Sequence, residues 1–598
     1  MTSKTSDFLI SIATVNGSGS QTANNILLRS LFRMGMPVGG KNVFPSNISG
    51  MPTWFWIRSN QNGFLGAKSW ANIVLAFNAQ TFESDQKLLK PGSFFFYPEE
   101  MALLKKVRND IVSIPLPFKS LSDQIKAPPK IKKMAANMIY VGILAELLKI
   151  PKELIQEVLQ DQLRNKPSVI EPNLAALEIG RTYSQEKLNS LDWPYQSKLQ
   201  EKPIDKILMD GNTAAALGLL AGGCQFISWY PITPSTSLVE TFSRFANKTR
   251  KDEQNKNKFA LVQAEDEISA FSMVMGAGWA GARSMTATSG PGLSLMAEGA
   301  GYAYYAEIPS VIWNVQRLGP STGLPTRTAQ GDITFSAHLS HGDAKHVLLI
   351  PSNLEECFEF GQTCFDLAER LQQLVIVLSD LDLGMNLSIS PLLRSDSKEY
   401  DRGKVLTSEE LDNLKKFNRY EDIDGDGICS RTLPGNSHPL AAYFTRGSGH
   451  NAQAQYSEKA NEYSENMIRL ERKWETAKTI VPSPIIRSNS NENGILYYGS
   501  TLAIAEELDF LMAEKNIKFD HCRLRAYPFS KSVEEFLKEH QNIYIIEQNH
   551  DGQMRTLLSQ AFPQWASRFK SILHFDGTPI TADSVRDKIL EIYSGDVL

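Results

Sequence analysis

The chain has 598 residues and a mass of 66.7 kDa, which corresponds to about three to five domains of ordinary size. Its 62 Lys and Arg nearly balance its 66 Asp and Glu, and a net charge of −4 argues against a nucleic-acid partner or a membrane surface. No apolar run approaches the roughly 18 residues of a membrane-spanning helix, and no signal peptide is evident. Five scattered cysteines without a C-x-x-C pair indicate a cytoplasmic protein, and a metal or iron–sulfur cluster held by this chain alone is not expected.

The N-terminal part of the chain has the order strand, glycine-containing loop, helix. An apolar strand is predicted at 8–15 and a Gly/Ser loop at 17–20. Three helices are predicted at 24–35, 138–150 and 152–163. This order predicts an α/β domain over residues 1–185. A polar, proline-containing stretch at 167–203 is predicted to be a linker.

The middle part alternates small-residue helices with short apolar strands. Helices are predicted at 211–223 and 266–282, and strands at 225–231, 284–290, 310–316 and 346–351. Such alternation predicts a parallel sheet covered on both faces, which we place at residues 206–385. A polar connector with one helix near 464–478 is expected over 386–485, and a second, smaller α/β domain over 486–598.

Two short motifs have competing interpretations. Gly17 and Gly19 lie between a strand and a helix, where they fit either a phosphate-binding loop or a tight turn, and the dinucleotide-binding pattern is incomplete. Asp422, Asp424 and Asp426 are spaced like the start of a calcium loop. Leu433 stands where that loop requires a bidentate Glu, so a solvated acidic loop is expected instead.

Chemistry-bearing side chains follow one of the predicted strands of the middle domain. The segment WYPITPSTS at 229–237 supplies two prolines and several hydroxyls, at the end of a parallel strand where ligands bind. Glu265, Asp266 and Glu267 then lead into a helix rich in Gly and Ala. Acids at a helix start complement its dipole, but the small residues indicate close packing against a partner.

A further strand of the middle domain ends at an arginine. Arg317 follows the strand at 310–316 and precedes a loop rich in Gly and Pro that runs to Arg327. An arginine in this position fits a bidentate clamp for a carboxylate.

At these residues the sequence resembles the α subunit of 2-oxoacid:ferredoxin oxidoreductases, in the fused γ–α form typical of 2-oxoglutarate:ferredoxin oxidoreductase. The segments that carry the resemblance are YPITPSTS, EDEISAFSMVMGAGWAGARSMTATSGPGLSLM and RLGPSTGLPTRTAQGD, with NGSGSQTANNILLR and GKNVFPSNISGMPTW for the γ portion and IIEQNHDGQ for the C-terminal domain. The resemblance implies an α/β fold of three domains: a γ-like, CoA-associated domain, a pyrimidine-type thiamine-diphosphate domain with a parallel sheet, and a smaller transketolase-C-like domain.

The resemblance also implies cofactors and partners. Thiamine diphosphate would be shared with a β subunit that carries Mg²⁺ and a [4Fe-4S] cluster, CoA would be the co-substrate and ferredoxin the electron acceptor. The assembly would be an αβ heterodimer or (αβ)2. Because this chain lacks the magnesium motif and the cluster cysteines, we expect it to be the pyrimidine half of the site, without activity on its own.

Individual roles follow from matching residues. Glu267 matches the glutamate that hydrogen-bonds the aminopyrimidine of thiamine, and Tyr230 and Pro231 of the YPITP motif are assigned to the cofactor as well. Lys41 and Asn42 are assigned to the phosphate or pantetheine of CoA.

The same matching assigns substrate contacts. Thr233 and Arg317 match positions that hold the 2-oxo-carboxylate, and Thr326 matches a position near the distal end of the substrate. A second substrate carboxylate requires a second cation, for which Arg327 is available in this chain.

The leading hypothesis is therefore a subunit that takes part in CoA-dependent oxidative decarboxylation of 2-oxoglutarate to succinyl-CoA. Pyruvate or branched-chain 2-oxoacids are alternative substrates. A non-redox thiamine-dependent decarboxylase subunit is an alternative function, which the γ-like N-terminal domain disfavours. A third hypothesis is a nucleotide-binding scaffold without catalysis, and its only support is the glycine loop at Gly17 and Gly19.

Overall fold

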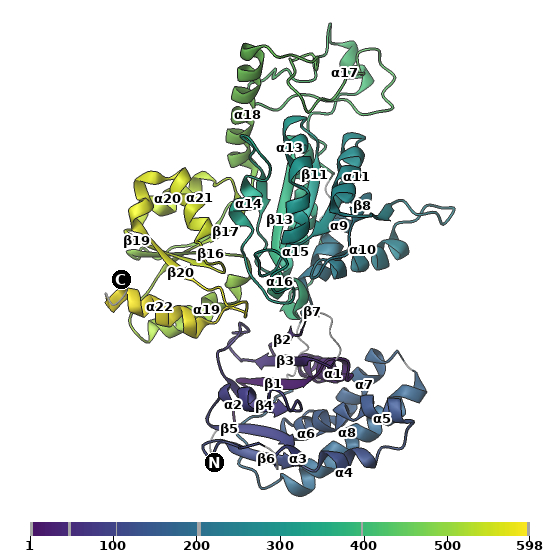
Figure 1. The fold of residues 1–598 in the computed structure, drawn as a ribbon, viewed down its shortest axis with the longest axis vertical. Helices are drawn as coiled ribbons and strands as arrows, with labels where there is room; N and C mark the ends of the chain where they lie inside the picture. Colours follow the sequence, from purple (N-terminus) through teal and green to yellow (C-terminus); the bar gives the residue numbers. More distant parts are fainter. Residues whose placement is uncertain are drawn as a thin grey trace.

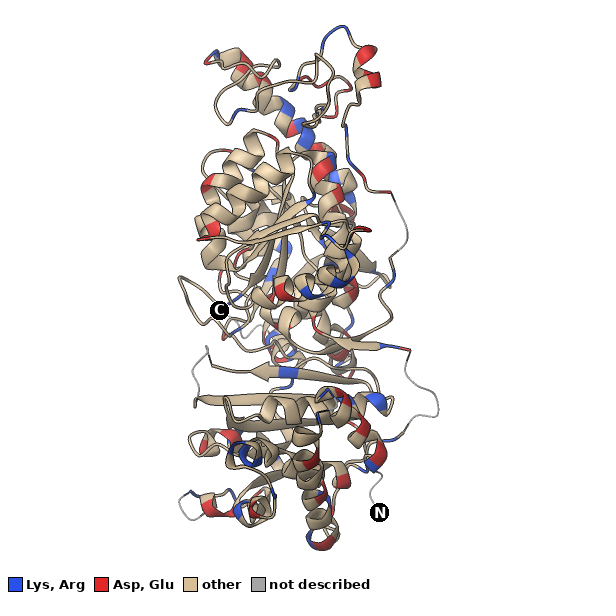
Figure 2. Cartoon of the chain, turned by 90° about the vertical axis from the view of Figure 1, so that its right-hand side faces the viewer, with Lys and Arg blue, Asp and Glu red and all other residues tan. Residues whose placement is uncertain are grey.

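The computed structural model describes residues 4–45, 50–102, 105–164, 166–199, 205–395 and 399–594. Figure 1 shows three sheet-containing domains: an N-terminal domain at the bottom, a middle domain above it and a C-terminal domain at its side. In the view of Figure 2, acidic and basic residues lie close to one another along the chain, and neither sign is gathered in one part of it. None of the described helices is long and apolar enough to cross a lipid bilayer.

The N-terminal domain is built on a six-stranded sheet in the order β2-β3-β1-β4-β5-β6, in which β1 pairs antiparallel with β3 and parallel with β4. Its strands are β1 (Phe8–Val15), β2 (Val38–Val43), β3 (Pro52–Ser59), β4 (Ala71–Ala76), β5 (Leu89–Pro98) and β6 (Val112–Leu116). Its helices are α1 (Ser20–Arg33), α2 (Phe82–Lys87), α3 (Glu99–Ala102), α4 (Phe118–Asp123), α5 (Pro129–Ala135), α6 (Asn137–Leu147), α7 (Lys152–Gln162) and α8 (Pro167–Lys187). The main apolar core lies between the sheet and helices α1, α6, α7 and α8.

The predicted linker at 167–203 is wrong over most of its length, because residues 167–187 form α8. This helix packs directly on α6. A Cβ on Gly142 would lie 2.1 Å from the Leu177 oxygen, and a Cβ on Gly180 would lie 2.0 Å from the Ile139 oxygen. Two glycines thus bring the two helix backbones into contact, and this packing stabilises a segment whose own composition favours a loop.

The middle domain confirms the predicted parallel sheet. Its seven strands have the order β18-β12-β13-β11-β10-β8-β9, and all run parallel except β18 (Ala526–Tyr527), which comes from the C-terminal part of the chain. The sheet strands of this domain are β8 (Phe226–Trp229), β9 (Ala260–Gln263), β10 (Ser284–Thr288), β11 (Ser310–Gln316), β12 (Val347–Leu349) and β13 (Leu374–Asp380), with β7 (Ile207–Met209) and β14 (Ser388–Ser390) paired separately.

Helices cover both faces of this sheet, as predicted. One face carries α9 (Gly211–Ala221), α10 (Thr236–Thr249) and α15 (Leu354–Leu371), and the other carries α11 (Glu267–Trp279), α12 (Gly290–Leu295) and α13 (Ala297–Tyr305). The short helix α14 (Ile333–Ala337) follows the long loop after β11, and the short helix α16 (Leu381–Met385) follows β13 directly. Because helices cover both faces, the strand ends are where a sheet of this kind binds its ligands.

The C-terminal domain has a five-stranded sheet in the order β15-β17-β16-β19-β20. Its elements are β15 (Ile485–Arg487), β16 (Asn493–Tyr498), α19 (Leu502–Ala513), β17 (Asp520–Leu524), β18 (Ala526–Tyr527), α20 (Lys531–Glu539), β19 (Asn542–Glu547), α21 (Gln553–Ala561), β20 (Phe569–Leu573) and α22 (Ala582–Ser594). Strand β18 pairs with β12 and so joins the middle sheet.

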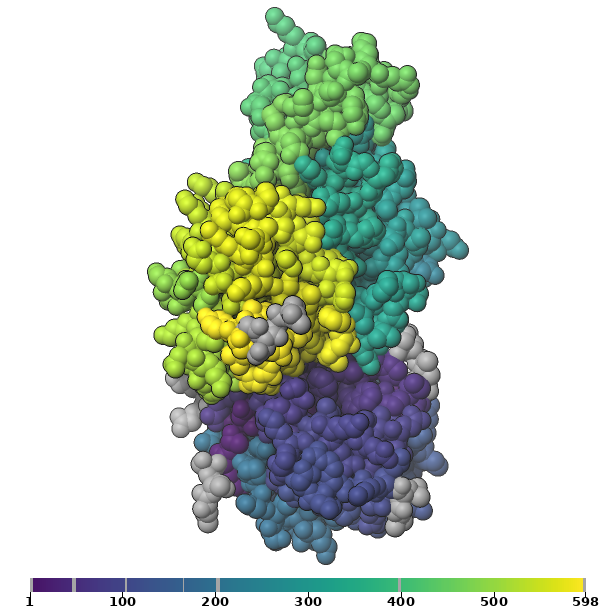
Figure 3. All heavy atoms as spheres, turned by 60° about the vertical axis from the view of Figure 1, so that its left-hand side comes forward, coloured from purple at the N-terminus to yellow at the C-terminus, as the bar shows by residue number. Residues whose placement is uncertain are grey.

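Figure 3 shows the C-terminal domain, in yellow, against both the middle and the N-terminal domain. A bidentate ion pair between Arg58 and Glu507 (2.6 and 2.8 Å) joins it to the N-terminal domain. The three domains therefore form one body around the strand ends of the middle sheet.

The connector contains α17 (Ser408–Asp412) and α18 (Ala460–Ile480), and a buried ion cluster ties α18 to the middle domain. The Glu307 carboxylate lies 2.5 Å from the Arg469 guanidinium and 2.8 Å from the Lys473 ammonium. Burial alone would raise the pKa of Glu307, but the charges of Arg469 and Lys473 outweigh this effect and lower it.

Replacing Glu307 by Gln is expected to destabilise the chain by about 3–5 kcal/mol, because Arg469 and Lys473 would stay buried without a counter-charge. The measurement is the urea midpoint at neutral pH. Glu471→Gln, which breaks an exposed ion pair of the same helix with Lys345, is the control and should cost about 1 kcal/mol or less.

The effect should also depend on pH. Since the folded state lowers the pKa of Glu307, its stabilising contribution is complete above about pH 4.3 and is lost as the pH falls further. The difference between wild type and Glu307→Gln should therefore shrink in acid. Equal midpoints of the two proteins at neutral pH would contradict this prediction.

Candidate active site

Three chain segments meet at the carboxyl ends of strands β8, β10 and β11. In the sheet, β10 lies between the other two, and all three run parallel. Residues 230–237 follow β8, residues 289–292 follow β10, and residues 317–332 follow β11. Parallel strands end at a common edge, so these three segments surround one place. The sequence analysis had singled out two of them, 229–237 and the loop from Arg317 to Arg327, but not residues 289–292.

Glu267 is the acid that the fold buries at this edge. It is the first residue of α11 and is 7% exposed. Asp266 is instead the N-cap of the helix and accepts a hydrogen bond from the Ser269 N–H at 2.7 Å, while Glu265 is exposed. Among the described residues, no group donates a hydrogen bond to the Glu267 carboxylate. The three neighbouring acids thus have three different environments, and only Glu267 is buried and free to bind.

A glycine makes room for the Glu267 side chain. A Cβ on Gly292 would lie 2.7 Å from Glu267 Cγ, 2.8 Å from its Oε1 and 2.2 Å from Thr288 Oγ1. Two further polar atoms of this edge, Ser289 Oγ and Asn314 Oδ1, are buried and have no hydrogen-bond partner in the described part of the chain. Unpaired buried polar atoms are costly, and their grouping is typical of a ligand site.

The YPITP loop is held in place by side chains from two other segments. Asn212 donates to the Pro234 oxygen at 3.0 Å and to Ser237 Oγ at 2.8 Å, and Arg317 donates to the Thr233 oxygen at 2.8 Å. Tyr230 and Pro231, the predicted cofactor contacts, are exposed at the tip of the loop.

Arg317 is buried between the two loops. Its guanidinium donates to the oxygens of Thr233 and Thr322, at 2.8 and 3.3 Å, which leaves a buried Nε without a partner in the described residues. The predicted carboxylate clamp therefore uses two of its five N–H groups on backbone oxygens, and the other three, that of Nε among them, have no partner in the described residues.

Thr326 and Arg327 bring the N-terminal domain to the same loop. Thr326 is buried, and the Arg327 guanidinium donates to the Thr326 oxygen at 3.0 Å and to the Phe44 oxygen at 3.1 Å. Phe44 directly follows β2. The γ-like domain thus contacts the predicted substrate loop.

Lys41 and Asn42 lie at a domain junction. The Lys41 ammonium is 2.5 Å from the Asp382 carboxylate, and the Asn42 N–H donates to the Asn386 side chain at 2.9 Å. Lys41 also borders a cavity of about 580 Å³ between the three domains. The prediction that these two residues contact CoA stays a prediction, and residues 46–49 of the neighbouring motif lie outside the described residues.

The structure adds site residues that the sequence analysis missed. Asn314 donates to the Asp332 carboxylate at 2.9 Å, and the Asp332 N–H donates to the Gln316 side chain at 3.0 Å. Burial raises the pKa of Asp332, against the opposing effects of Asn314 and Arg317. Two polar residues at alternate positions of a buried strand share one face, and this pattern was the available signal for Asn314 and Gln316. Asn212 and Asp332 had no comparable signal.

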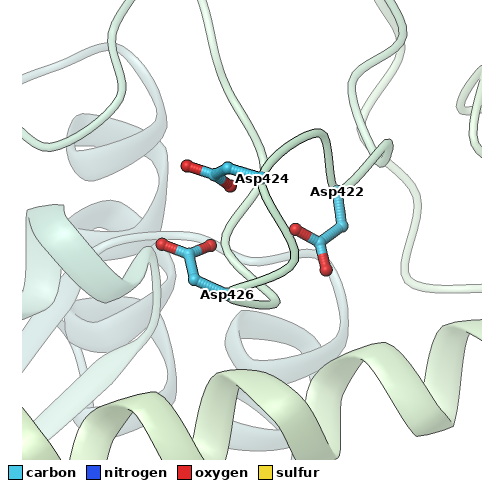
Figure 4. A group of neighbouring side chains, drawn as sticks. All are labelled: Asp422, Asp424 and Asp426. Carbon is cyan, nitrogen blue, oxygen red and sulfur yellow. The ribbon is translucent and has the colours of Figure 1, made fainter.

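Figure 4 shows the acidic group Asp422, Asp424 and Asp426, whose carboxylate oxygens lie within 4.8 Å of one another. The Lys404 ammonium lies between two of them, 2.6 Å from Asp424 and 2.7 Å from Asp426, and Arg472 pairs with Asp422 at 3.0 Å. Asp424 is exposed. Two protein cations therefore offset most of the charge of the three carboxylates in this loop, which lies in the connector.

Comparisons with known proteins identify the family. Family profiles described as "Pyruvate ferredoxin/flavodoxin oxidoreductase" and "Pyruvate flavodoxin/ferredoxin oxidoreductase, thiamine diP-bdg" match residues 10–183 and 217–413. The α subunit of 2-oxoacid:ferredoxin oxidoreductase 2 from Aeropyrum pernix is 30% identical over 92% of this chain and 92% of its own length. The chain belongs to the 2-oxoacid:ferredoxin oxidoreductase α subunits.

Two other relatives have 2-oxoglutarate in their names or titles. A 2-oxoglutarate synthase subunit KorA from Archaeoglobus fulgidus is 30% identical over 65% of this chain and 99% of its own length. The solved structure of 2-oxoglutarate:ferredoxin oxidoreductase from Magnetococcus marinus, "with 2-oxoglutarate, coenzyme A and succinyl-CoA bound", has a TM-score of 0.87 and 26% identity, and the match covers 98% of this chain and all of that one. The chain is thus a subunit of an oxidoreductase of 2-oxoacids, and the predicted α/β fold of three domains is confirmed.

The residues at the strand ends fit the pyrimidine side of thiamine diphosphate. A carboxylate without a donor matches a ring nitrogen that carries a proton, and the unpaired Ser289 and Asn314 oxygens match an amino group. Gly292 leaves space beside the carboxylate that any Cβ would fill. The match of the thiamine diphosphate-binding profile to residues 217–413 covers this whole edge.

Gly292→Ala is expected to lower turnover of the assembled enzyme by about 10²-fold, because its Cβ would displace the Glu267 carboxylate by the order of 1 Å. The measurement is the steady-state rate, together with the melting temperature of the chain. Gly276→Ala, on helix α11, is the control for the melting temperature. Its Cβ would meet nothing within 4 Å, so the melting temperature of this variant should not fall. Wild-type turnover in Gly292→Ala would show that Glu267 does not need this space.

Proposed function

We propose that this chain is the α subunit of a 2-oxoglutarate:ferredoxin oxidoreductase and that Glu267 is its acid–base residue toward thiamine diphosphate. The observation that carries the proposal is a buried carboxylate with no donor in the described chain, at the sheet edge where a thiamine site belongs. Thiamine diphosphate, when bound, supplies the electron sink for decarboxylation of a 2-oxoacid. Glu267 would hold and exchange the proton at the ring nitrogen that it faces.

Thr233 and Arg317 would bind the 2-oxo-carboxylate of the substrate. Support comes from the buried Arg317 Nε, a charged donor without a partner in the described residues, and from the hydrogen bond that fixes Arg317 to the Thr233 backbone. Thr326 and Arg327, further along the same loop, would contact the distal end, where a second carboxylate distinguishes 2-oxoglutarate from pyruvate.

CoA would approach from the N-terminal domain, with Lys41 and Asn42 as contacts of its phosphate or pantetheine. The Arg327–Phe44 hydrogen bond supports this arrangement, because it joins the end of β2 to the substrate loop. In the Magnetococcus marinus enzyme, 2-oxoglutarate and CoA bind to a protein of the same fold. Since Lys41 pairs with Asp382, a phosphate there would share the ammonium with that carboxylate.

A β subunit would cover the helix that starts at Glu267 and would hold Mg²⁺ and the [4Fe-4S] cluster, with ferredoxin as electron acceptor. Exposed apolar side chains on α11 and α12, namely Ile268, Met273 and Leu295, support a protein partner at this face. The five cysteines of the chain are free and buried, and burial raises the pKa of thiols such as Cys224 and Cys429, which disfavours the thiolate form that binds a cluster.

Glu267→Gln should leave assembly with the β subunit intact and lower turnover by about 10²–10⁴-fold, because the amide keeps the volume but cannot take part in proton transfer. CoA-dependent viologen reduction by the reconstituted complex measures it. Glu265→Gln is the matched control: this neighbouring carboxylate is exposed, and near-normal turnover is expected. Near-normal turnover of Glu267→Gln would refute the assignment.

The complex should prefer 2-oxoglutarate over pyruvate and branched-chain 2-oxoacids in kcat/KM. Arg327→Met should lower kcat/KM for 2-oxoglutarate by about tenfold or more and spare pyruvate, because a charged hydrogen bond to the distal carboxylate is lost. Comparing the 2-oxoacids with both proteins measures this preference. A wild-type preference for pyruvate would refute the substrate assignment, and an equal loss on both substrates would show that Arg327 acts only on the loop.

A further inference from the structure

One glutamine of the C-terminal domain, Gln553, makes several hydrogen bonds to the end of the predicted substrate loop. Gln553 is the first residue of α21, and its Oε1 accepts hydrogen bonds from the N–H groups of Ile333 and Thr334 at 2.9 and 3.1 Å. Its Nε2 donates to the Gly331 oxygen at 2.6 Å. A single side chain thus makes three hydrogen bonds to the backbone that follows the loop.

These bonds replace a helix cap. Asp332 stands at the N-cap position of α14 but makes no capping hydrogen bond with its side chain. Its carboxylate accepts instead from Asn314, on β11, at 2.9 Å. The first N–H groups of a helix need acceptors from elsewhere, and Gln553 supplies one from another domain. Asp332 is therefore free to face the strand end and Arg317.

Other contacts fix the same junction. Gln330 donates its N–H to the Gln548 oxygen at 2.8 Å, and its own oxygen accepts from the Asn549 side chain at 3.1 Å. The Thr328 N–H donates to the Gly577 oxygen at 3.1 Å. The loop is consequently fixed by Arg317 at its beginning and by the C-terminal domain at its end.

We infer that Gln553 is a positioning residue for substrate binding: it holds the backbone at 331–334 and, through it, the loop that presents Thr326 and Arg327. The inference rests on the proposed function, in which this loop contacts the 2-oxoacid. It assigns to the C-terminal domain, which supplies none of the proposed substrate contacts, a part in substrate affinity.

The test uses the reconstituted αβ complex with three variants. Gln553→Ala removes all three hydrogen bonds. Gln553→Glu keeps an acceptor for Ile333 and Thr334 but loses the donor to Gly331, so it should behave as an intermediate. Gln560→Ala changes an exposed glutamine of the same helix and is the matched control.

Two readouts are compared. Hydrogen exchange of the amides at 331–334 should be about tenfold faster in Gln553→Ala, less affected in Gln553→Glu and unchanged in Gln560→Ala. The KM for 2-oxoglutarate should rise about tenfold in Gln553→Ala with a smaller change in kcat, and Gln553→Glu should restore part of the affinity.

Unchanged exchange at 331–334 in Gln553→Ala would overturn the inference, and so would faster exchange with an unchanged KM. Failure of the proposed function is a separate result: wild-type complex that oxidises no 2-oxoacid would refute that function, while the exchange measurement would still decide whether Gln553 holds the segment.

Discussion

The Glu267 carboxylate is the constraint on which the rest of the site depends. It is buried at the start of α11, and no donor in the described chain satisfies it. Gly292 keeps the space beside it open, and Ile268 and Met273 on the outer side of the same helix are exposed apolar side chains. The chain thus presents half of a binding site.

Segments from all three domains hold the loops that carry the other site residues. Arg317 and Asn212 fix the YPITP loop from within the middle domain, Phe44 of the N-terminal domain contacts Arg327, and Gln553 of the C-terminal domain fixes the far end of the loop. No single domain could hold these positions alone. Contacts between the domains therefore suit the chemistry, because reacting groups must be held in place to within about 1 Å.

The sequence predicted the strands and small-residue helices of the middle domain because their signals are local. Short apolar runs such as 310–316 must be buried on both faces, and parallel strands then place Glu267, Thr233 and Arg317 at one edge. Helix α8 escaped prediction because its stability comes from close packing on α6 through Gly142 and Gly180, a contact between distant residues. Asn212 and Asp332 escaped for the same reason, since their partners lie on other elements.

By itself, the sequence determined the residue types, their order along the chain and the strand ends at which they stand, because burial and periodicity act over a few neighbouring residues. Only the tertiary structure decided which of three adjacent acids is buried, since Asp266 became a helix cap and Glu265 stayed in solvent. It also decided that two nitrogens of Arg317 donate to backbone oxygens and that Gln553 accepts from the first N–H groups of α14, in another domain. Those outcomes depend on long-range contacts, which no local pattern encodes.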